Sequence, residues 1–156
     1  MEEVKIGVYV CQCGINIASS VDVPNVVRFA GRLPNVTVAR DYKYMCSEPA
    51  EKMIAGDIKE MGINRVVVAS CTPRMHETTF QTVLKESGLN PYYFEMANIR
   101  EHVSWVIKDR EAGAENAKLL VRATVFRVDY QARVEPRKKP VTQASLSPAG
   151  AVTVRS

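Results

Sequence analysis

Four cysteines, Cys11, Cys13, Cys46 and Cys71, are the residues of this chain with the most specific chemistry. The first two form one C-x-C pair, and the other two stand alone further along the chain. Thiolates are soft ligands for zinc and for iron–sulfur clusters, and they also act as nucleophiles in redox reactions. The acidic N-terminus leads directly into a strand-like segment instead of a signal peptide, so we expect a cytoplasmic protein. Structural disulfides are uncommon there, and the sequence therefore predicts free thiols.

The segments around these cysteines alternate between strand-like and helix-like patterns. Strands are expected where β-branched and aromatic residues concentrate, at residues 4–10, 36–42, 63–70 and 92–96. Long helices are expected where capping residues, prolines and apolar periodicity coincide, at residues 22–31, 47–62, 72–88 and 114–132. A further helix is expected after Asn98, which forms a capping-box pattern with Glu101. This order predicts an α/β fold with an open, mainly parallel sheet of about four strands, helices on both faces and a long C-terminal helix.

The predicted order of elements also brings the four cysteines together. Cys11 and Cys13 follow the first strand, Cys46 follows the second, and Cys71 closes the third. Because the carboxyl ends of parallel strands meet at one edge, where open α/β folds bind ligands, we expect all four thiols at one rim. Four thiolates suit a [4Fe-4S] cluster. Zinc is possible with the same ligands, although zinc ribbons favour two C-x₂-C pairs, and free cysteines also occur simply as small buried residues.

Two further side chains near the start of the third helix are candidates for the same site. Arg74 could bind an anion or shield the charge of a cluster, and His76 could hydrogen-bond around it. Cys71 and His76 could also form a thiol–imidazole pair. The sequence predicts that Arg74 and His76 surround a cofactor and that the four cysteines are its ligands.

Composition and charge exclude several classes of protein. Of the 156 residues, 46% are apolar and 24% are charged, which is typical of one globular domain. The net charge of +4 lies entirely in residues 133–156, while residues 1–132 contain 16 basic and 16 acidic residues. We therefore predict a single domain over 1–132 followed by a basic, proline-containing linker or tail over 133–156. No nucleic-acid face and no membrane-spanning segment are expected.

Four long segments carry a resemblance to a known family. They are IGVYVCQCGINIA (Ile6–Ala18), YKYMCSEP (Tyr42–Pro49), RVVVASCTPRMHETTF (Arg65–Phe80) and NPYYFEMANIREHVSWV (Asn90–Val106). In this order they resemble the N-terminal domain of the A subunit of heterodisulfide reductase, over roughly residues 4–143. Members of that family are flavoproteins with several [4Fe-4S] clusters that act in complexes performing flavin-based electron bifurcation, and in methanogenesis such complexes reduce the coenzyme M–coenzyme B heterodisulfide.

The resemblance implies an electron-transfer domain with a [4Fe-4S] cluster on Cys11, Cys13, Cys46 and Cys71. Its implied partners are other heterodisulfide reductase-type subunits and a flavoprotein, and a homodimer is possible. The stretch that resembles the start of the family's flavin-binding region, residues 140–143, is not followed here by a GxGxxG loop. FAD is therefore expected only in the remaining flavoprotein portion or a partner, and the chain is not expected to be catalytic alone.

Two alternatives to the electron-transfer prediction stay open. One is a cluster-free domain that docks other members of the same complex, and the other is a thiol redox protein that uses Cys71 as its nucleophile. The last long helix supports a docking role in either case, because Leu119, Phe126 and Tyr130 lie on the side opposite its apolar stripe. We expect this face to pack on a second copy or on the flavin-bearing subunit.

Overall fold

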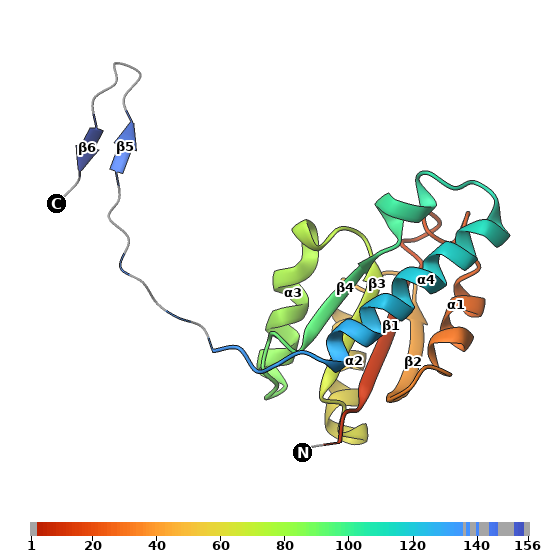
Figure 1. Ribbon diagram of the computed structural model, residues 1–156, viewed down its shortest axis with the longest axis horizontal. Coiled ribbons are helices and arrows are strands. Elements are labelled where there is room, and N and C mark those ends of the chain that lie inside the picture. Colours follow the sequence, from red (N-terminus) through yellow and green to blue (C-terminus); the bar gives the residue numbers. More distant parts are fainter. Residues whose placement is uncertain (1–2, 136, 138–139, 141–143, 147–151, 155–156) are drawn as a thin grey trace.

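The first strand lies inside the sheet, with further strands on both of its sides (Figure 1). The structure is a computed structural model and describes residues 3–135, 137, 140, 144–146 and 152–154. Four parallel strands lie in the order β2-β1-β3-β4. Their bounds are Ile6–Cys11 (β1), Val36–Tyr42 (β2), Arg65–Ser70 (β3) and Phe94–Asn98 (β4). The strand order reverses between β1 and β3, the position at which open α/β sheets bind ligands.

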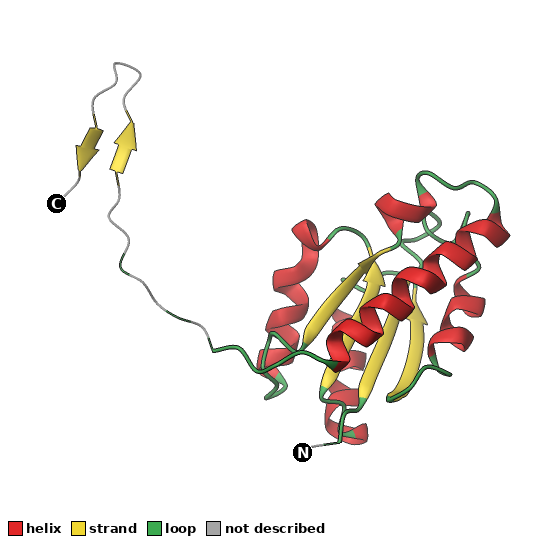
Figure 2. Ribbon diagram, viewed as in Figure 1, coloured by secondary structure: helices red, strands yellow, loops and turns green. Residues whose placement is uncertain are grey.

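Helices cover both faces of this sheet, and the predicted α/β class is confirmed (Figure 2). Their bounds are Val23–Ala30 (α1), Glu48–Met61 (α2), Pro73–Glu86 (α3) and Arg110–Asp129 (α4). Helices α1 and α4 pack together on one face, and α2 and α3 contact each other on the opposite face. In the part of the chain that the structure describes, no helix is both long enough and apolar enough to span a bilayer.

Burial explains why β1 and β3 form the centre of the sheet. Every residue of β1 is buried, and so is every residue of β3 after Arg65. Strands of this kind show continuous apolar sequence because helices cover both of their faces. The edge strand β2 is mostly only partly buried and contains charged residues such as Arg40 and Asp41.

Several elements differ from the expectations, among them α4, β4 and the helix expected after Asn98. Helix α4 begins at Arg110, four residues earlier than predicted, because the Asp109 side chain accepts a hydrogen bond from the Ala112 amide at 2.7 Å. Strand β4 begins at Phe94, two residues later than predicted. The helix expected after Asn98 is a single π-helical turn, η1, over Arg100–Ser104.

A glycine fixes how closely α4 approaches the loop that follows β1. Gly113 is buried in the first turn of α4, and a Cβ atom added there would overlap the backbone carbonyl oxygen of Ser20. Only glycine permits this approach of a helix to another backbone segment.

The segment predicted as a tail contains one pair of short strands, Ala144–Leu146 (β5) and Val152–Val154 (β6), which pair antiparallel. The predicted domain boundary between residues 132 and 133 stays a prediction. Part of the proposed basic tail lies outside the described residues.

A buried polar group joins two strands to α2. The Tyr9 hydroxyl donates to Asp57 Oδ2 at 3.1 Å, and Arg40 donates to both oxygens of Asp57 at 2.9 and 3.0 Å. Tyr9 and the Asp57 side chain are almost fully buried, whereas Arg40 is partly exposed. Burial, with the charge of Asp57, raises the pKa of Tyr9, so its hydroxyl stays protonated and continues to donate.

We predict that Asp57→Ala lowers the free energy of unfolding by about 3 kcal/mol, because the buried Tyr9 hydroxyl loses its acceptor and Arg40 its partner. Tyr9→Phe should cost about 1 kcal/mol, since one hydrogen bond is lost without a new unpaired group on that residue. Urea denaturation followed by circular dichroism measures both. Glu60→Ala, at an exposed site of the same helix, is the control and should change stability by less than about 0.5 kcal/mol. A loss of similar size in Asp57→Ala and Glu60→Ala would contradict the role given to this group.

Candidate functional site

The four cysteines, although far apart in sequence, line one small cavity at the carboxyl edge of the sheet. The cavity has a volume of about 40 Å³. Its lining consists of Cys11, Cys13, Tyr44, Cys46, Ser70, Cys71, His76, Phe80 and Arg100. All four thiols are free. The expected convergence of the cysteines at one rim is therefore what the strand order produces.

The thiols differ in depth. Cys11 is the last residue of β1 and Cys71 follows β3 directly, and both are buried at the ends of the two central strands. Cys13 is half-buried in the loop after β1, and Cys46 is exposed in the loop between β2 and α2. The site thus has two interior thiols and two at its rim.

Backbone amides point at the innermost sulfur. Cys11 Sγ accepts hydrogen bonds from the amide of Cys13 at 3.2 Å and from the amide of Met45 at 3.3 Å. These donors come from two different loops, one after β1 and one after β2. Amide donors of this kind stabilise negative charge on a sulfur that serves as a ligand.

The loop after β1 has an unusual backbone at Cys13. Cys13 has φ of +50° and Gly14 has φ of +65°. A left-handed conformation costs a residue with a side chain roughly 1–2 kcal/mol, and such residues concentrate at functional sites. The loop is held by the Gly14 amide, which donates to the Lys43 carbonyl at 3.0 Å.

Two helices begin beside the thiols without side-chain caps. Ser47 follows Cys46 and precedes α2. Thr72 follows Cys71 and precedes α3. Neither side chain makes a capping hydrogen bond. Both other α-helices are capped by aspartate side chains. The first-turn amides of α2 and α3 therefore add partial positive charge next to Cys46 and Cys71 without a competing carboxylate cap.

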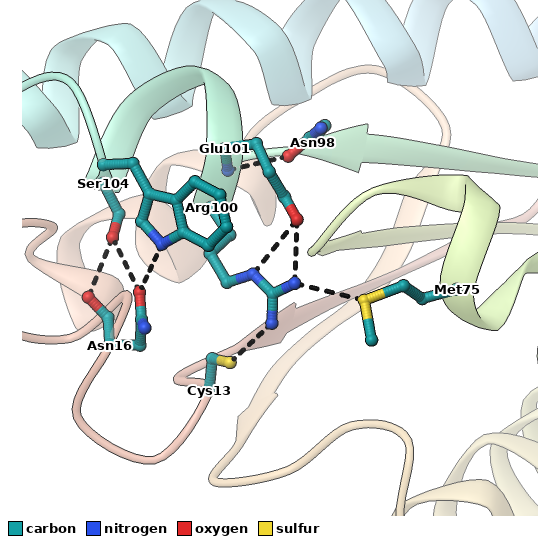
Figure 3. Close-up of polar contacts among 8 residues, drawn as sticks. Cys13, Asn16, Met75, Asn98, Arg100, Glu101 and Ser104 are labelled. Carbon is teal, nitrogen blue, oxygen red and sulfur yellow. Dashed lines mark hydrogen bonds and ion pairs between the residues drawn. The ribbon is translucent and has the colours of Figure 1, made fainter.

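An arginine from the loop after β4 reaches across the site (Figure 3). Arg100 Nη1 donates to Cys13 Sγ at 3.5 Å, and Arg100 Nη2 donates to Met75 Sδ at 3.3 Å. Its Nε and Nη2 also donate to Glu101 Oε1 at 3.2 and 2.8 Å. The guanidinium thus connects the loops that follow β1 and β4 with the first turn of α3.

The π-helical turn that carries Arg100 is fixed on both sides. The Glu101 amide donates to Asn98 Oδ1 at 3.0 Å, and the Ile99 amide donates to the Ser70 carbonyl at 2.9 Å. At the far end of the turn, Trp105 Nε1 donates to Asn16 Oδ1 at 3.1 Å, and Ser104 Oγ donates to the Asn16 carbonyl at 2.8 Å (Figure 3). These contacts tie the turn to the end of β3 and to the loop after Cys13.

Burial and charge act in opposite directions on the titratable groups. Burial raises the pKa of Cys11 and of Cys71, against the amide donors at Cys11 and the positive charge of Arg100 at Cys71. Burial alone would lower the pKa of Arg100, but its hydrogen bonds to Cys13 and Glu101 raise it. Burial alone would raise the pKa of Glu101, but Arg100 lowers it. The Arg100–Glu101 pair is therefore fully charged beside the thiols.

The two other predicted site residues lie in different surroundings. His76 is half-buried and lines the cavity with the thiols. Arg74 is exposed, and the described residues that line the cavity do not include it. The roles predicted for both residues stay predictions.

Sequence reasoning missed Arg100, Ser70 and Tyr44, which also line the cavity. Arg100 was detectable in principle, because it follows the fourth strand and therefore belongs to the same edge of the sheet. Ser70 Oγ is buried in the wall of the cavity next to Cys71. Burial raises the pKa of Cys71, and the Ser70 hydroxyl acts against this rise.

The donor set fits a sulfur-ligated metal group. Four free thiols share the wall of one cavity with a fixed guanidinium. Among the described residues, no three His, Cys, Asp or Glu side chains are grouped closely enough to hold a single metal ion. Four thiols from separate loops suit an iron–sulfur cluster, in which different irons take different thiolates.

Fold and site together define an α/β domain with four thiols at the switch point of a parallel sheet. The chain is 54% identical to the second A-type iron-sulfur subunit of the CoB–CoM heterodisulfide reductase of Methanopyrus kandleri, over 97% of this chain and 23% of that protein. It is 54% identical to the A subunit of the H₂:CoB–CoM heterodisulfide,ferredoxin reductase of Methanothermobacter marburgensis, with the same shares covered. It is 48% identical to a protein of Archaeoglobus profundus named as similar to the heterodisulfide reductase A subunit, over 97% of this chain and 22% of that protein.

The chain is similar to heterodisulfide reductase A subunits and is a domain of their N-terminal type. The resemblance of its four motifs is thereby confirmed. It spans about a quarter of the length of these relatives. No protein-family model matches the chain.

The positive φ of Cys13 leads to a prediction about stability that can be tested without any cofactor. In the cluster-free protein, Cys13→Gly should be about 1 kcal/mol more stable than Cys13→Ala, because only glycine adopts positive φ without strain. Chemical denaturation of the two variants measures the difference. The same pair of substitutions at Cys46, which lies outside the positive-φ region, is the control. There the order should reverse, and the same order at both positions would contradict backbone strain at Cys13.

Proposed function

We propose that this chain is an electron-transfer domain of a heterodisulfide reductase-type complex, with one [4Fe-4S] cluster on Cys11, Cys13, Cys46 and Cys71. Such a cluster, when bound, accepts and releases single electrons. The chain's own residues supply the thiolates, the amide donors to Cys11 and the charged Arg100–Glu101 pair. Electrons would be exchanged with a flavoprotein, either in a separate partner or in a longer polypeptide. This role assigns a chemical function to the similarity with the A subunits.

The observation that carries the proposal is the shared cavity of the four thiols. Zinc and iron–sulfur clusters both take thiolate ligands. The name of the relative from Methanopyrus kandleri contains the words iron-sulfur, which supports a cluster over zinc.

The burial of Cys71 weighs against the thiol redox alternative. A nucleophilic cysteine needs an accessible thiolate, but Cys71 is only 7% exposed and its neighbours close the cavity around it. Burial also raises the pKa of Cys71, which disfavours the thiolate. A cluster-free docking domain would leave the convergence of the four thiols without a purpose.

Iron loading of single-site variants tests the proposal. After anaerobic reconstitution, the wild-type protein should contain iron and sulfide in equal amounts and show the visible absorption of an iron–sulfur cluster. Cys11→Ala, Cys46→Ala and Cys71→Ala should each lose most of the iron, because each removes one of four ligands. The reconstituted protein should also melt at a higher temperature than the chelated protein, since binding energy is folding energy.

Cys13 is the informative member of this series. If Cys13→Ala retains full iron and an unchanged spectrum, Cys13 is a neighbour of the cluster and not its ligand. Ser19→Ala, in the exposed part of the same loop, controls for damage to the loop. Full iron in all four cysteine variants would overturn the assignment, and zinc in place of iron and sulfide would favour the alternative metal.

The exposed face of α4 supports a place in an assembly. Leu119 is 55% exposed, Phe126 is 43% exposed and Tyr130, which follows the helix, is 84% exposed. The opposite side of α4 is buried and includes Val121 and Val125. A helix whose second side is this apolar is typical of a protein interface. We include in the proposal that this face packs on a second copy of the chain or on a flavin-bearing subunit.

Phe126→Ser tests this face. Light scattering coupled to size-exclusion chromatography should give a dimer for the wild-type chain, or a complex with a heterodisulfide reductase-type flavoprotein, and the variant should weaken that association by about tenfold or more. Glu111→Ser, at an exposed position in the first turn of the same helix and distant from Phe126, is the control. A strictly monomeric chain that neither binds the flavoprotein nor responds to Phe126→Ser would refute the interface.

A further inference from the structure

We propose that Arg100 and Glu101 form a positioning pair that holds the sulfur of Cys13 in place and sets the electrostatic potential at the thiol site. The redox role of the pair rests on the proposed cluster, whereas its structural role concerns the protein alone. Arg100 and Glu101 lie in the loop after β4, the strand that supplies no cysteine. The end of β4 would thus contribute charged side chains to the site, whereas the ends of β1, β2 and β3 contribute thiols.

The guanidinium restrains one of the two thiols at the rim of the site. Cys13 is half-buried in a left-handed turn, and Arg100 Nη1 donates to its sulfur at 3.5 Å. Other nitrogens of the same group bind Met75 Sδ and Glu101 Oε1. A planar guanidinium with donors fixed in three directions holds a sulfur more rigidly than a flexible ammonium group does.

The carboxylate of Glu101 has a separate electrostatic role. The side chains of Arg100 and Glu101 are only 16% and 18% exposed, so solvent screens their charges weakly. Glu101 Oε1 accepts from Arg100 at 2.8 Å. The two opposite charges therefore act on the thiol site from neighbouring positions, and removing either one leaves the other unbalanced.

The contacts around Arg100 and Glu101 hold the pair in a fixed position. Arg100 opens a π-helical turn, a rare geometry that is frequent at functional sites. Asn98 binds the amide of Glu101, and the centre of the Trp105 ring lies 5.3 Å from the guanidinium carbon of Arg100. The turn is thus held at both ends, and the guanidinium has little freedom to leave Cys13.

The electrostatic role predicts opposite effects for the two members of the pair. A positive charge stabilises the more negative, reduced form of a nearby redox group, and a negative charge destabilises it. The midpoint potential of the reconstituted wild-type protein should therefore become more negative in Arg100→Gln and less negative in Glu101→Gln. Arg100→Lys should restore most of the wild-type potential because it keeps the charge. General loosening of the site cannot produce shifts of opposite sign.

The structural role is tested without a cluster. In the reduced, cluster-free protein labelled with ¹³C at cysteine, the Cβ resonance of Cys13 should move in Arg100→Gln and stay in place in Arg32→Gln. Arg32 is the matched control, since it is an exposed arginine that does not line the cavity. The midpoint potential of Arg32→Gln should also equal that of the wild-type protein.

Each measurement has a result that would overturn one role of the Arg100–Glu101 pair. An unmoved Cys13 resonance in Arg100→Gln overturns the positioning role, whether or not a cluster binds. Potentials that shift in the same direction in Arg100→Gln and Glu101→Gln overturn the electrostatic role, and so does a shift in Arg32→Gln equal to that in Arg100→Gln. If the wild-type protein binds no cluster, the proposed function fails, and the Cys13 resonance alone confirms or rejects the positioning of that thiol by Arg100.

Discussion

The parallel pairing of β1 with its neighbours on both sides is the constraint on which the site depends. Register places Val10 opposite Ala69 of β3 and Cys11 opposite Tyr42 of β2, so the three strands end together. A slip of one residue would turn Cys11 to the other face of the sheet and separate it from the amides of Cys13 and Met45. Cys11 and Cys71, which are distant in sequence, meet only because of this register.

The group formed by Tyr9, Asp57 and Arg40 stabilises the same arrangement from within the fold. It connects β1, β2 and α2, which are the elements on either side of Cys11 and Cys46. A loop is free to carry reactive residues when the elements that flank it are rigid. Cys46 is exposed in its loop, yet the strand and the helix that flank this loop are fixed by the buried hydrogen-bonded group.

The placement of the thiols could be predicted from sequence because strand ends are easy to locate. The buried runs of β1 and β3 and the prolines that open α2 and α3 bracket each cysteine closely. The end of the fourth strand places Arg100 at the same edge, but its contact with Cys13 depends on a π-helical turn that has no simple residue pattern and on the reach of a long side chain. The apolar periodicity also misses the N-cap Asp109 and leaves Gly113 outside the last helix. The close approach that requires glycine at 113 is a tertiary contact with Ser20, and nothing local to α4 reveals it.

That contact has a mechanical consequence. The backbone of Ser20 packs directly against Gly113. The Ser20 hydroxyl donates to the carbonyl of Ser104 at the end of η1. Backbones this close have little room to absorb a displacement, and close-packed interiors transmit strain instead of damping it. Helix α4, the π-helical turn and the stretch of chain over residues 16–21 therefore form one closely packed unit. This unit connects the exposed side chains Leu119 and Phe126 with the turn of Cys13.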